Sequence, residues 1–297
     1  MSTTQGPDGL VRARLDLAYD GGGFAGWAAQ PGQRTVAGVL VEGLATLLRM
    51  PVEDLVVVVA GRTDTGVHAR GQVCHVDVPL EGWQRLPGRS DLPPERSLLR
   101  RLAGVLPPDI RVHGAAVAAP GFDARFSALH RRYSYRLCDS GFSAPPLRRH
   151  DVLVEAGPLD VEAMDAASRA LVGLNDFAAF CRRREGATTV RHLLEYSWSR
   201  EQTPDGDLLV ARVVADAFCH SMVRALVGGA VAVGAGRRPV GWLCEAMLTA
   251  RRDPAVGVVA PRGLVLEEVR YPPDDELAAR AAEARNTRTL PSAPDPR

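Results

Sequence analysis

The sequence predicts an α+β fold of two related lobes, with mixed, mainly antiparallel sheets flanked by helices. Segments with the alternating pattern of strands and segments with helical spacing interleave in both halves of the chain, which is typical of this class. Apolar residues make up 46% of the 297 residues, enough for a proper core. The connections between the strand-like segments favour antiparallel pairing.

In the first half, residues 11–19 alternate between apolar and polar side chains and predict a strand. Thr35 precedes an apolar helical face and is interpreted as the N-cap of a helix. The remaining predictions are strands at about 54–60, 71–78 and 109–117, a loop at 81–94 that is rich in proline, glycine and charge, and a helix near 95–104.

The second half shows a similar order of patterns. It predicts strands at 131–138, 150–155, 189–199, 207–215 and 264–270, and helices from Asp160, at about 219–233 and at 239–250. We therefore expect a flexible N-terminus at 1–10, an N-terminal lobe at 11–118, a C-terminal lobe at 119–271 and a polar, disordered tail at 272–297 without a packing face.

Composition excludes several classes of protein. No apolar run is long enough for a membrane helix, and the polar start shows no secretion signal. The five cysteines are odd in number and lack CxxC spacing, which favours reduced thiols in a cytoplasm over a disulfide framework.

The charge pattern is compatible with two interpretations. The net charge is only +1, but every basic residue is an arginine, and arginines cluster at 131–132, 148–149 and 182–184. These clusters are either solvated surface charges or the local patches that bind RNA phosphates.

Residues 61–69, GRTDTGVHA, form the most informative segment. They follow a valine-rich apolar run and precede a second predicted strand, a place where enzymes often carry their chemistry. Asp64 offers a nucleophile or base beside the permanent charge of Arg62. His68 is either an acid–base group or a structural histidine of the loop.

Two apparent cofactor motifs are rejected. Residues 21–26 match GxGxxG, but Pro31-Gly32 soon follows and breaks the helix that a dinucleotide site needs. We expect instead a glycine turn that brings Phe24 and Trp27 onto the core. The two Cys-His pairs suggest zinc, yet neighbouring strand residues point to opposite faces and four ligands at a recognisable spacing are missing.

Two further segments contain candidate site residues. In the strand at 131–138, Arg131, Tyr133 and Tyr135 share one face and Arg132 takes the other. Tyr133 beside arginines suits stacking on an extruded base, although a strand with half-buried tyrosines explains the pattern as well.

Arg224 lies in a predicted helix that is apolar on nearly every side. A buried arginine needs a partner, because removing one costs about 3–5 kcal/mol. Asp64 is an attractive partner, and a guanidinium that reaches solvent at the helix edge is the alternative.

Taken together, these segments resemble the pseudouridine synthases, and specifically those that act on tRNA. The matching segments, which occur in the same order and span about 11–271, are the loop GRTDTGVHA at 61–69, YDG at 19–21, GW at 26–27, GQV at 71–73, LPPDI at 106–110, FDARFSA at 122–128, RYSY at 132–135, GLNDF at 173–177, AF at 217–218, MVR at 222–224, AP at 260–261 and GL at 263–264.

The resemblance implies the pseudouridine synthase fold, with ferredoxin-like or RRM-like halves, and a reaction without cofactor or metal. Uridine is isomerised to pseudouridine, at uridines thirty-eight to forty of the tRNA anticodon stem-loop, by a cytoplasmic homodimer. Asp64 is implied to be the essential nucleophile or base, Tyr133 to stack on the target base, Arg224 to pair with Asp64 and Arg62 to fill the space of the extruded nucleotide. His68, Arg131 and Arg132 are candidate substrate-binding residues.

Two other hypotheses remain at this point. A non-catalytic RNA-binding protein on the same scaffold would bind tRNA with steep salt dependence and convert no uridine. A nucleotide-dependent dehydrogenase is the less favoured hypothesis, because the glycine motif of this chain is not followed by the helix that a dinucleotide site needs.

Overall fold

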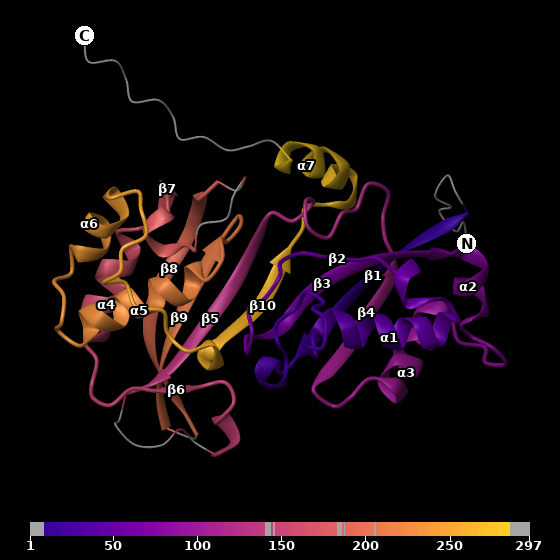
Figure 1. Cartoon of the computed structure of the whole chain (residues 1–297), viewed down its shortest axis with the longest axis horizontal. Coiled ribbons are helices and arrows are strands. Elements are labelled where there is room, and N and C mark those ends of the chain that lie inside the picture. Colours follow the sequence, from indigo (N-terminus) through magenta and orange to yellow (C-terminus); the bar gives the residue numbers. More distant parts are fainter. Residues whose placement is uncertain are drawn as a thin grey trace, which may run out of the picture. The chain divides into compact units, whose positions relative to one another are not determined.

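The computed structural model describes residues 9–139, 144, 146–182, 186, 188–204 and 206–285. The chain forms two compact units (Figure 1). Unit 1 runs to Leu129 and includes Leu266–Arg285, and unit 2 spans His130–Val265. The chain thus leaves unit 1 after Leu129 and returns at Leu266, whereas the predicted lobes were 11–118 and 119–271. Residues 1–8 of the expected flexible start lie outside the described residues.

Unit 1 is built on antiparallel strands whose alternating side chains bury one face. In β1, every second residue is buried from Val11 to Tyr19, as the sequence pattern predicted. The strand order is β4-β1-β3-β10, with β2 paired to β3. The strands are β1 (Leu10–Tyr19), β2 (Val57–Val59), β3 (His68–Pro79), β4 (Ile110–Val117) and β10 (Leu264–Arg270).

The helices of unit 1 pack through apolar faces. Thr35 is the N-cap of α1, as predicted: its Oγ1 accepts a hydrogen bond from Gly38 N at 3.2 Å, a cap that stabilises a helix by about 1 kcal/mol. Leu40 and Leu44 are buried on the inner face of α1. The helices are α1 (Val36–Leu48), α2 (Leu80–Arg85), α3 (Pro94–Val105) and α7 (Leu277–Ala284), with single-turn 3-10 helices η1 (Gly21–Gly23), η2 (Val52–Asp54) and η6 (Asp274–Glu276).

Two predictions for unit 1 were wrong. The segment 81–94 is not a loop throughout, because α2 forms around Trp83, which is only 2% exposed. The segment from 272 does have a packing face: Leu277 and Ala281 of α7 are buried, and Ser127 Oγ donates to Leu277 O at 3.1 Å. Residues 286–297 of the predicted tail lie outside the described residues.

Unit 2 has the strand order β5-β9-β8-β7, all antiparallel, with the short β6 parallel to β5. The α+β class and the mainly antiparallel pairing are therefore confirmed. β7 was missed, and β6 is shorter than predicted. The strands are β5 (His130–Cys138), β6 (Leu153–Val154), β7 (Gly173–Asp176), β8 (Val190–Thr203) and β9 (Gly206–Ala215); the helices are α4 (Val161–Arg169), α5 (Met222–Gly234) and α6 (Trp242–Leu248), with η3 (Pro146–Arg148), η4 (Ala178–Phe180) and η5 (Pro261–Gly263).

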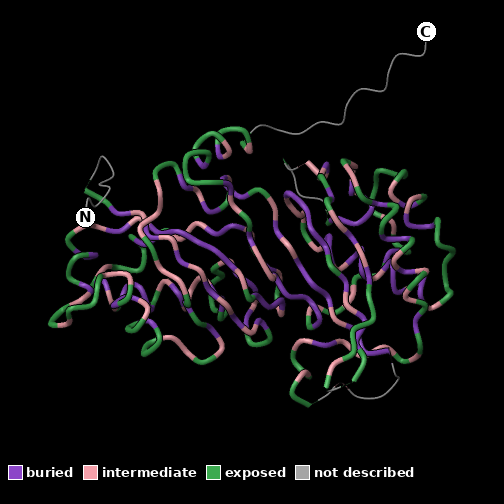
Figure 2. Tube along the Cα trace, turned by 180° about the vertical axis from the view of Figure 1, so that it is seen from behind, coloured by how far each residue is buried: buried purple, intermediate pink, exposed green. Residues whose placement is uncertain are grey.

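In unit 2, hydrogen bonds join α4 to β8, and α4 and α5 pack closely against each other. Trp198 of β8 donates through Nε1 to Ser168 Oγ at 3.1 Å and through its backbone N to Asp165 Oδ1 at 2.8 Å. Gly234 of α5 has no room for a Cβ beside Met164 of α4. Buried residues follow the strands in each unit (Figure 2). Within the part of the chain that the structure describes, no helix combines the length and the apolar character needed to cross a bilayer.

His75 makes the stability of unit 1 sensitive to pH. Its Nδ1 accepts a hydrogen bond from Ala124 N at 3.0 Å, and burial, followed by the charge of Arg12, lowers its pKa from 6.5 to about 4. The folded chain therefore resists protonation between these values, while the unfolded chain takes up a proton below its ordinary pKa. Stability from this group is complete above pH about 6.5 and is lost as the pH falls towards about 4.

We expect the free energy of unfolding to fall by about 2 kcal/mol through this group, after discounting for partial solvent screening. Urea unfolding of the wild type and of His75→Asn at pH 7.5 and pH 5 measures it. Asparagine keeps an acceptor near the Nδ1 position but does not titrate, so the variant should lose less stability over this range. Equal losses in the two proteins would contradict the assignment.

Candidate functional site

Residues 61–67 form a loop that connects β2 to β3, as the sequence predicted. His68, which was predicted to lie in the loop, is the first residue of β3. Thr63 and Val67 are buried, Asp64 is half-buried and Arg62 is exposed. The loop is thus anchored by Thr63 and Val67, while Arg62 is exposed to solvent.

The glycine-rich segment after β1 is hydrogen-bonded to this loop and packs against it. Trp27 N donates to Thr63 O at 3.1 Å, and Gly66 N donates to Phe24 O at 3.3 Å. Gly21 has no space for a Cβ, because that atom would overlap the carbonyl of Val67. As predicted, the turn brings Phe24 and Trp27 onto the core, at 3% and 2% exposure. The glycines therefore serve close packing of backbone against backbone.

A buried polar network supports the loop from β1 and β3. Gln72, fully buried, donates through Nε2 to Gly61 O at 2.9 Å and to the Tyr19 hydroxyl at 3.1 Å. Burial raises the pKa of Tyr19 to about 12, so the hydroxyl keeps its proton at neutral pH. Its oxygen lies 2.8 Å from Thr63 Oγ1. The sequence signals for this support were the GQV segment at 71–73 and the presence of a glutamine among buried strand residues.

The two ring nitrogens of His68 differ in their surroundings. Gly21 N donates to its Nδ1 at 3.0 Å, and in the neutral ring this places the proton on Nε2. That buried nitrogen has no hydrogen-bond partner among the described residues. Asp20 Oδ1 also lies 3.0 Å from Nδ1, a contact that becomes an ion pair only in a protonated ring.

The remaining predicted residues belong to unit 2, and three of them lie on β5. Arg131 and Tyr133 are buried, at 8% and 7% exposure, and Arg132 is half-buried. Arg131 Nη1 donates to Asp216 O at 2.6 Å. The Tyr133 ring meets Phe218 edge to face, with centroids 5.1 Å apart and planes at 88°. Sequence reasoning did not single out Phe218.

Arg224 lies in the first turn of α5 and is half-buried rather than buried. Its Nε donates to Val259 O at 2.8 Å, and Val259 N donates to Arg224 O at 3.3 Å. Tyr135 lies nearby: burial raises its pKa, the positive charge of Arg224 partly offsets that rise, and its hydroxyl donates to Ala260 O at 2.7 Å. The arginine is thus part of a packed junction between α5, β5 and the segment before β10.

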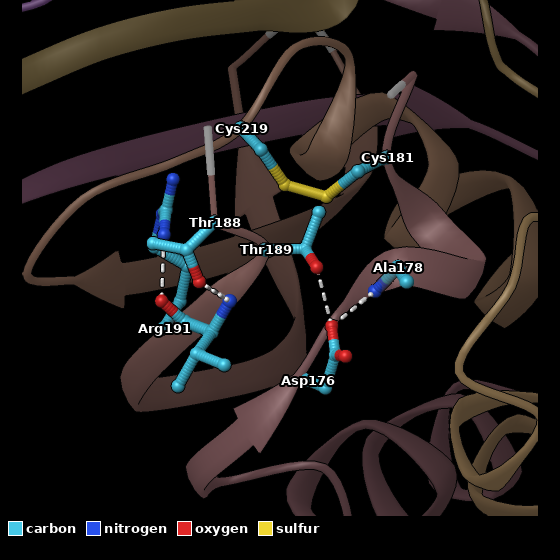
Figure 3. The surroundings of a disulfide bond; sticks show 8 residues. Asp176, Ala178, Cys181, Thr188, Thr189, Arg191 and Cys219 are labelled. Atoms are coloured by element: carbon cyan, nitrogen blue, oxygen red, sulfur yellow. Dashed lines mark hydrogen bonds between the residues drawn. A yellow bond between two sulfur atoms is a disulfide. The ribbon is translucent and has the colours of Figure 1, made fainter. Parts of the chain in front are cut away.

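The cysteines correct one prediction. Cys181, after η4, and Cys219, before α5, form a disulfide across a sequence separation of 38 residues (Figure 3). The expectation that all five are reduced thiols was therefore wrong; Cys74, Cys138 and Cys244 are free. No spacing rule connects two cysteines so far apart in sequence, and the fold brings their Cα atoms to 5.8 Å.

The other arginine clusters are mixed in character. Arg148 forms an ion pair with Asp151 at 2.8 Å, and Arg149 donates to Pro146 O at 2.9 Å. Arg182 is exposed, while residues 183 and 184 lie outside the described residues. Because Arg148 is paired with Asp151, it is better interpreted as a structural surface charge than as a ligand of RNA phosphate.

The predicted residues are thus divided between the units: Arg62, Asp64 and His68 in unit 1, the others in unit 2. A family model described as tRNA pseudouridine synthase matches residues 167–272. Proteins named tRNA pseudouridine synthase A are similar along nearly the whole chain. The one from Streptomyces griseus subsp. griseus is 54% identical over 97% of this chain and 98% of its own length. The one from Frankia casuarinae is 57% identical over 96% and 98%.

A third relative of that name, from Mycobacterium leprae, is 50% identical over 94% of this chain and 96% of its own. Identity at this level along entire chains, together with the loop carrying Asp64, decides the question of family. This chain belongs to the tRNA pseudouridine synthase family, enzymes that isomerise uridine in tRNA.

Proposed function

We propose that the chain isomerises uridines thirty-eight to forty in the anticodon stem-loop of tRNA, with Asp64 as the essential nucleophile or base. The observation that carries the proposal is the way the loop is built. Its backbone is fastened by Trp27, Phe24 and Gln72, while Asp64 itself is only half-buried. A carboxylate held rigidly on a well-packed loop is what covalent or general-base chemistry needs.

The remaining roles follow from the physics of acting on a stacked base. The target must leave the stem at a cost of a few kcal/mol, and stacking on an aromatic ring returns about 1–3 kcal/mol. We assign that stacking to Tyr133. Arg62, which is exposed, fills the space of the extruded nucleotide. Arg224 supplies the positive charge for Asp64, because a guanidinium favours the ionised form of a carboxylate.

The substrate-binding residues are His68, Arg131 and Arg132. His68 is the first residue of β3 and directly follows the loop of Asp64, which supports a role beside the substrate. Arg131 and Arg132 lie on the strand of Tyr133 and bring positive charge to the same element. By the same proposal the enzyme is a cytoplasmic homodimer, acts on tRNA in that compartment and needs no cofactor or metal.

The substrate proposal is tested with anticodon stem-loops that carry a single [5-³H]uridine at position thirty-eight, thirty-nine or forty. Isomerisation joins C5 to the ribose, so the C5 hydrogen is lost to water and tritium release counts turnovers. We expect release from each of the three substrates and none from a stem-loop labelled elsewhere. Salt-dependent tRNA binding without release would instead favour the RNA-binding alternative.

A further inference from the structure

Phe218 lies in the loop between β9 and α5 and is half-buried. Its contact with Tyr133 is the edge-to-face geometry that aromatic pairs prefer, and such a pair resists rotation of either ring. The two rings come from different elements, because Tyr133 is on β5. The orientation of Tyr133 therefore depends on where the loop 216–221 holds Phe218.

This loop is fastened on both sides of Phe218. Before it, Asp216 O accepts from Arg131 Nη1 at 2.6 Å, and Asp216 N donates to His192 O at 3.2 Å. The first of these bonds ties the loop to the same strand that carries Tyr133.

After Phe218, the very next residue is Cys219, which is covalently joined to Cys181 (Figure 3). Arg182 N also donates to His220 O at 3.1 Å, beside the disulfide. Ser221 then adopts the left-handed conformation, with φ of 62°, where α5 begins. A side chain between two such anchors has little freedom to move away from its neighbour.

We propose that Phe218 is a positioning residue that fixes the ring of Tyr133 for stacking on the target base, and that the Cys181–Cys219 disulfide holds Phe218 in place. The proposal rests on the proposed role of Tyr133. It makes the disulfide part of the catalytic apparatus, although neither sulfur takes part in the reaction. Reduction of this bond should therefore act on the same step as loss of the Phe218 ring.

The first arm measures kcat and KM for tritium release by Phe218→Leu and Phe218→Tyr. Leucine keeps most of the volume of the side chain but removes the ring. We expect kcat to fall about 3–10-fold, which corresponds to the free energy of one aromatic pair, while KM and the melting temperature change little. Tyrosine keeps the ring and should restore activity. In a Tyr133→Leu background, Phe218→Leu should have no further effect. An equal fall of kcat in both backgrounds would assign Phe218 a merely structural role and overturn the proposal.

The second arm reduces the disulfide with dithiothreitol, a dithiol. Its thiolate attacks one sulfur of the pair to give a mixed disulfide, and its second thiol then closes a cyclic disulfide, which leaves Cys181 and Cys219 as thiols. Reduction should lower kcat of the wild type as Phe218→Leu does, and should leave Phe218→Leu unchanged. Cys244→Ser is the matched control, because that thiol is free and this variant should respond like the wild type. An unchanged kcat after complete reduction overturns the role of the disulfide.

A third readout does not depend on activity. In protein labelled with 3-fluorotyrosine, the Tyr133 resonance is assigned by its loss in Tyr133→Phe. Both Phe218→Leu and reduction should shift it, because Phe218 no longer holds or shields the ring. No shift in either case overturns the inference. If the wild type releases no tritium, the proposed function fails; if only the Phe218 effects are missing, this inference alone fails.

Discussion

Replacing Asp64 by asparagine should lower tritium release from tRNA at least about 10³-fold, because the variant has no nucleophile or base at the reacting centre. The fold should survive, since asparagine keeps the size of the side chain and the loop is fastened through backbone groups, among them Val67 N, which donates to Asp64 O at 3.1 Å. Single-turnover tritium release and a melting curve measure the two effects.

Asp54→Asn is the matched control for this change. Asp54 is an exposed aspartate of unit 1, in η2, so the same loss of charge there should leave activity near the wild-type value. If Asp64→Asn retained more than about a tenth of the activity, the role of Asp64 as the essential group would have to be abandoned.

Arg224→Ala should lower both activity and stability. The change leaves Val259 O without the donor that now lies at 2.8 Å, which we expect to cost about 1–3 kcal/mol in the free energy of unfolding. Loss of the counter-charge proposed for Asp64 should lower kcat by about 10²–10³-fold. Urea unfolding and tritium release measure the two effects separately.

Arg224→Lys separates charge from geometry. Lysine keeps the positive charge but cannot reproduce the fixed direction of Nε, so activity should lie between those of the wild type and the alanine variant. Arg237→Ala, at an exposed position just after α5, controls for removing an arginine. Unchanged stability and activity in Arg224→Ala would show that this side chain has neither role.

The sequence was sufficient to predict those elements and residues whose structure depends on their immediate neighbours in the chain. Alternation of apolar residues located β1, the hydroxyl of Thr35 located the start of α1, and Pro31 excluded a dinucleotide helix. The loop around Asp64 could be recognised because strand, turn and polar residues follow one another without interruption. Each of these signals lies within one segment of the chain.

Three of the failures depend on contacts between distant segments. α7 exists because Leu277 and Ala281 find a surface more than a hundred residues away in sequence, beside Ser127. The disulfide joins cysteines whose spacing carries no signal. The AF segment at 217–218 could be matched to the family, but the contact of the Phe218 ring with Tyr133 could not be predicted from it. Local patterns contain no information about such partners, so the sequence alone could not supply them.

The return of the chain to unit 1 has a consequence for its synthesis. β3 is followed in the strand order by β10, and Gly71 leaves no space for a Cβ against Glu267 O. Ribosomes make β3 nearly two hundred residues before β10, so the part of this strand's edge that β2 does not pair with stays uncovered while all of unit 2 is translated. Uncovered edges of this kind promote pairing between chains. The nascent protein is therefore most vulnerable to aggregation just before its last strand emerges, and truncation before Leu264 should leave it in that state.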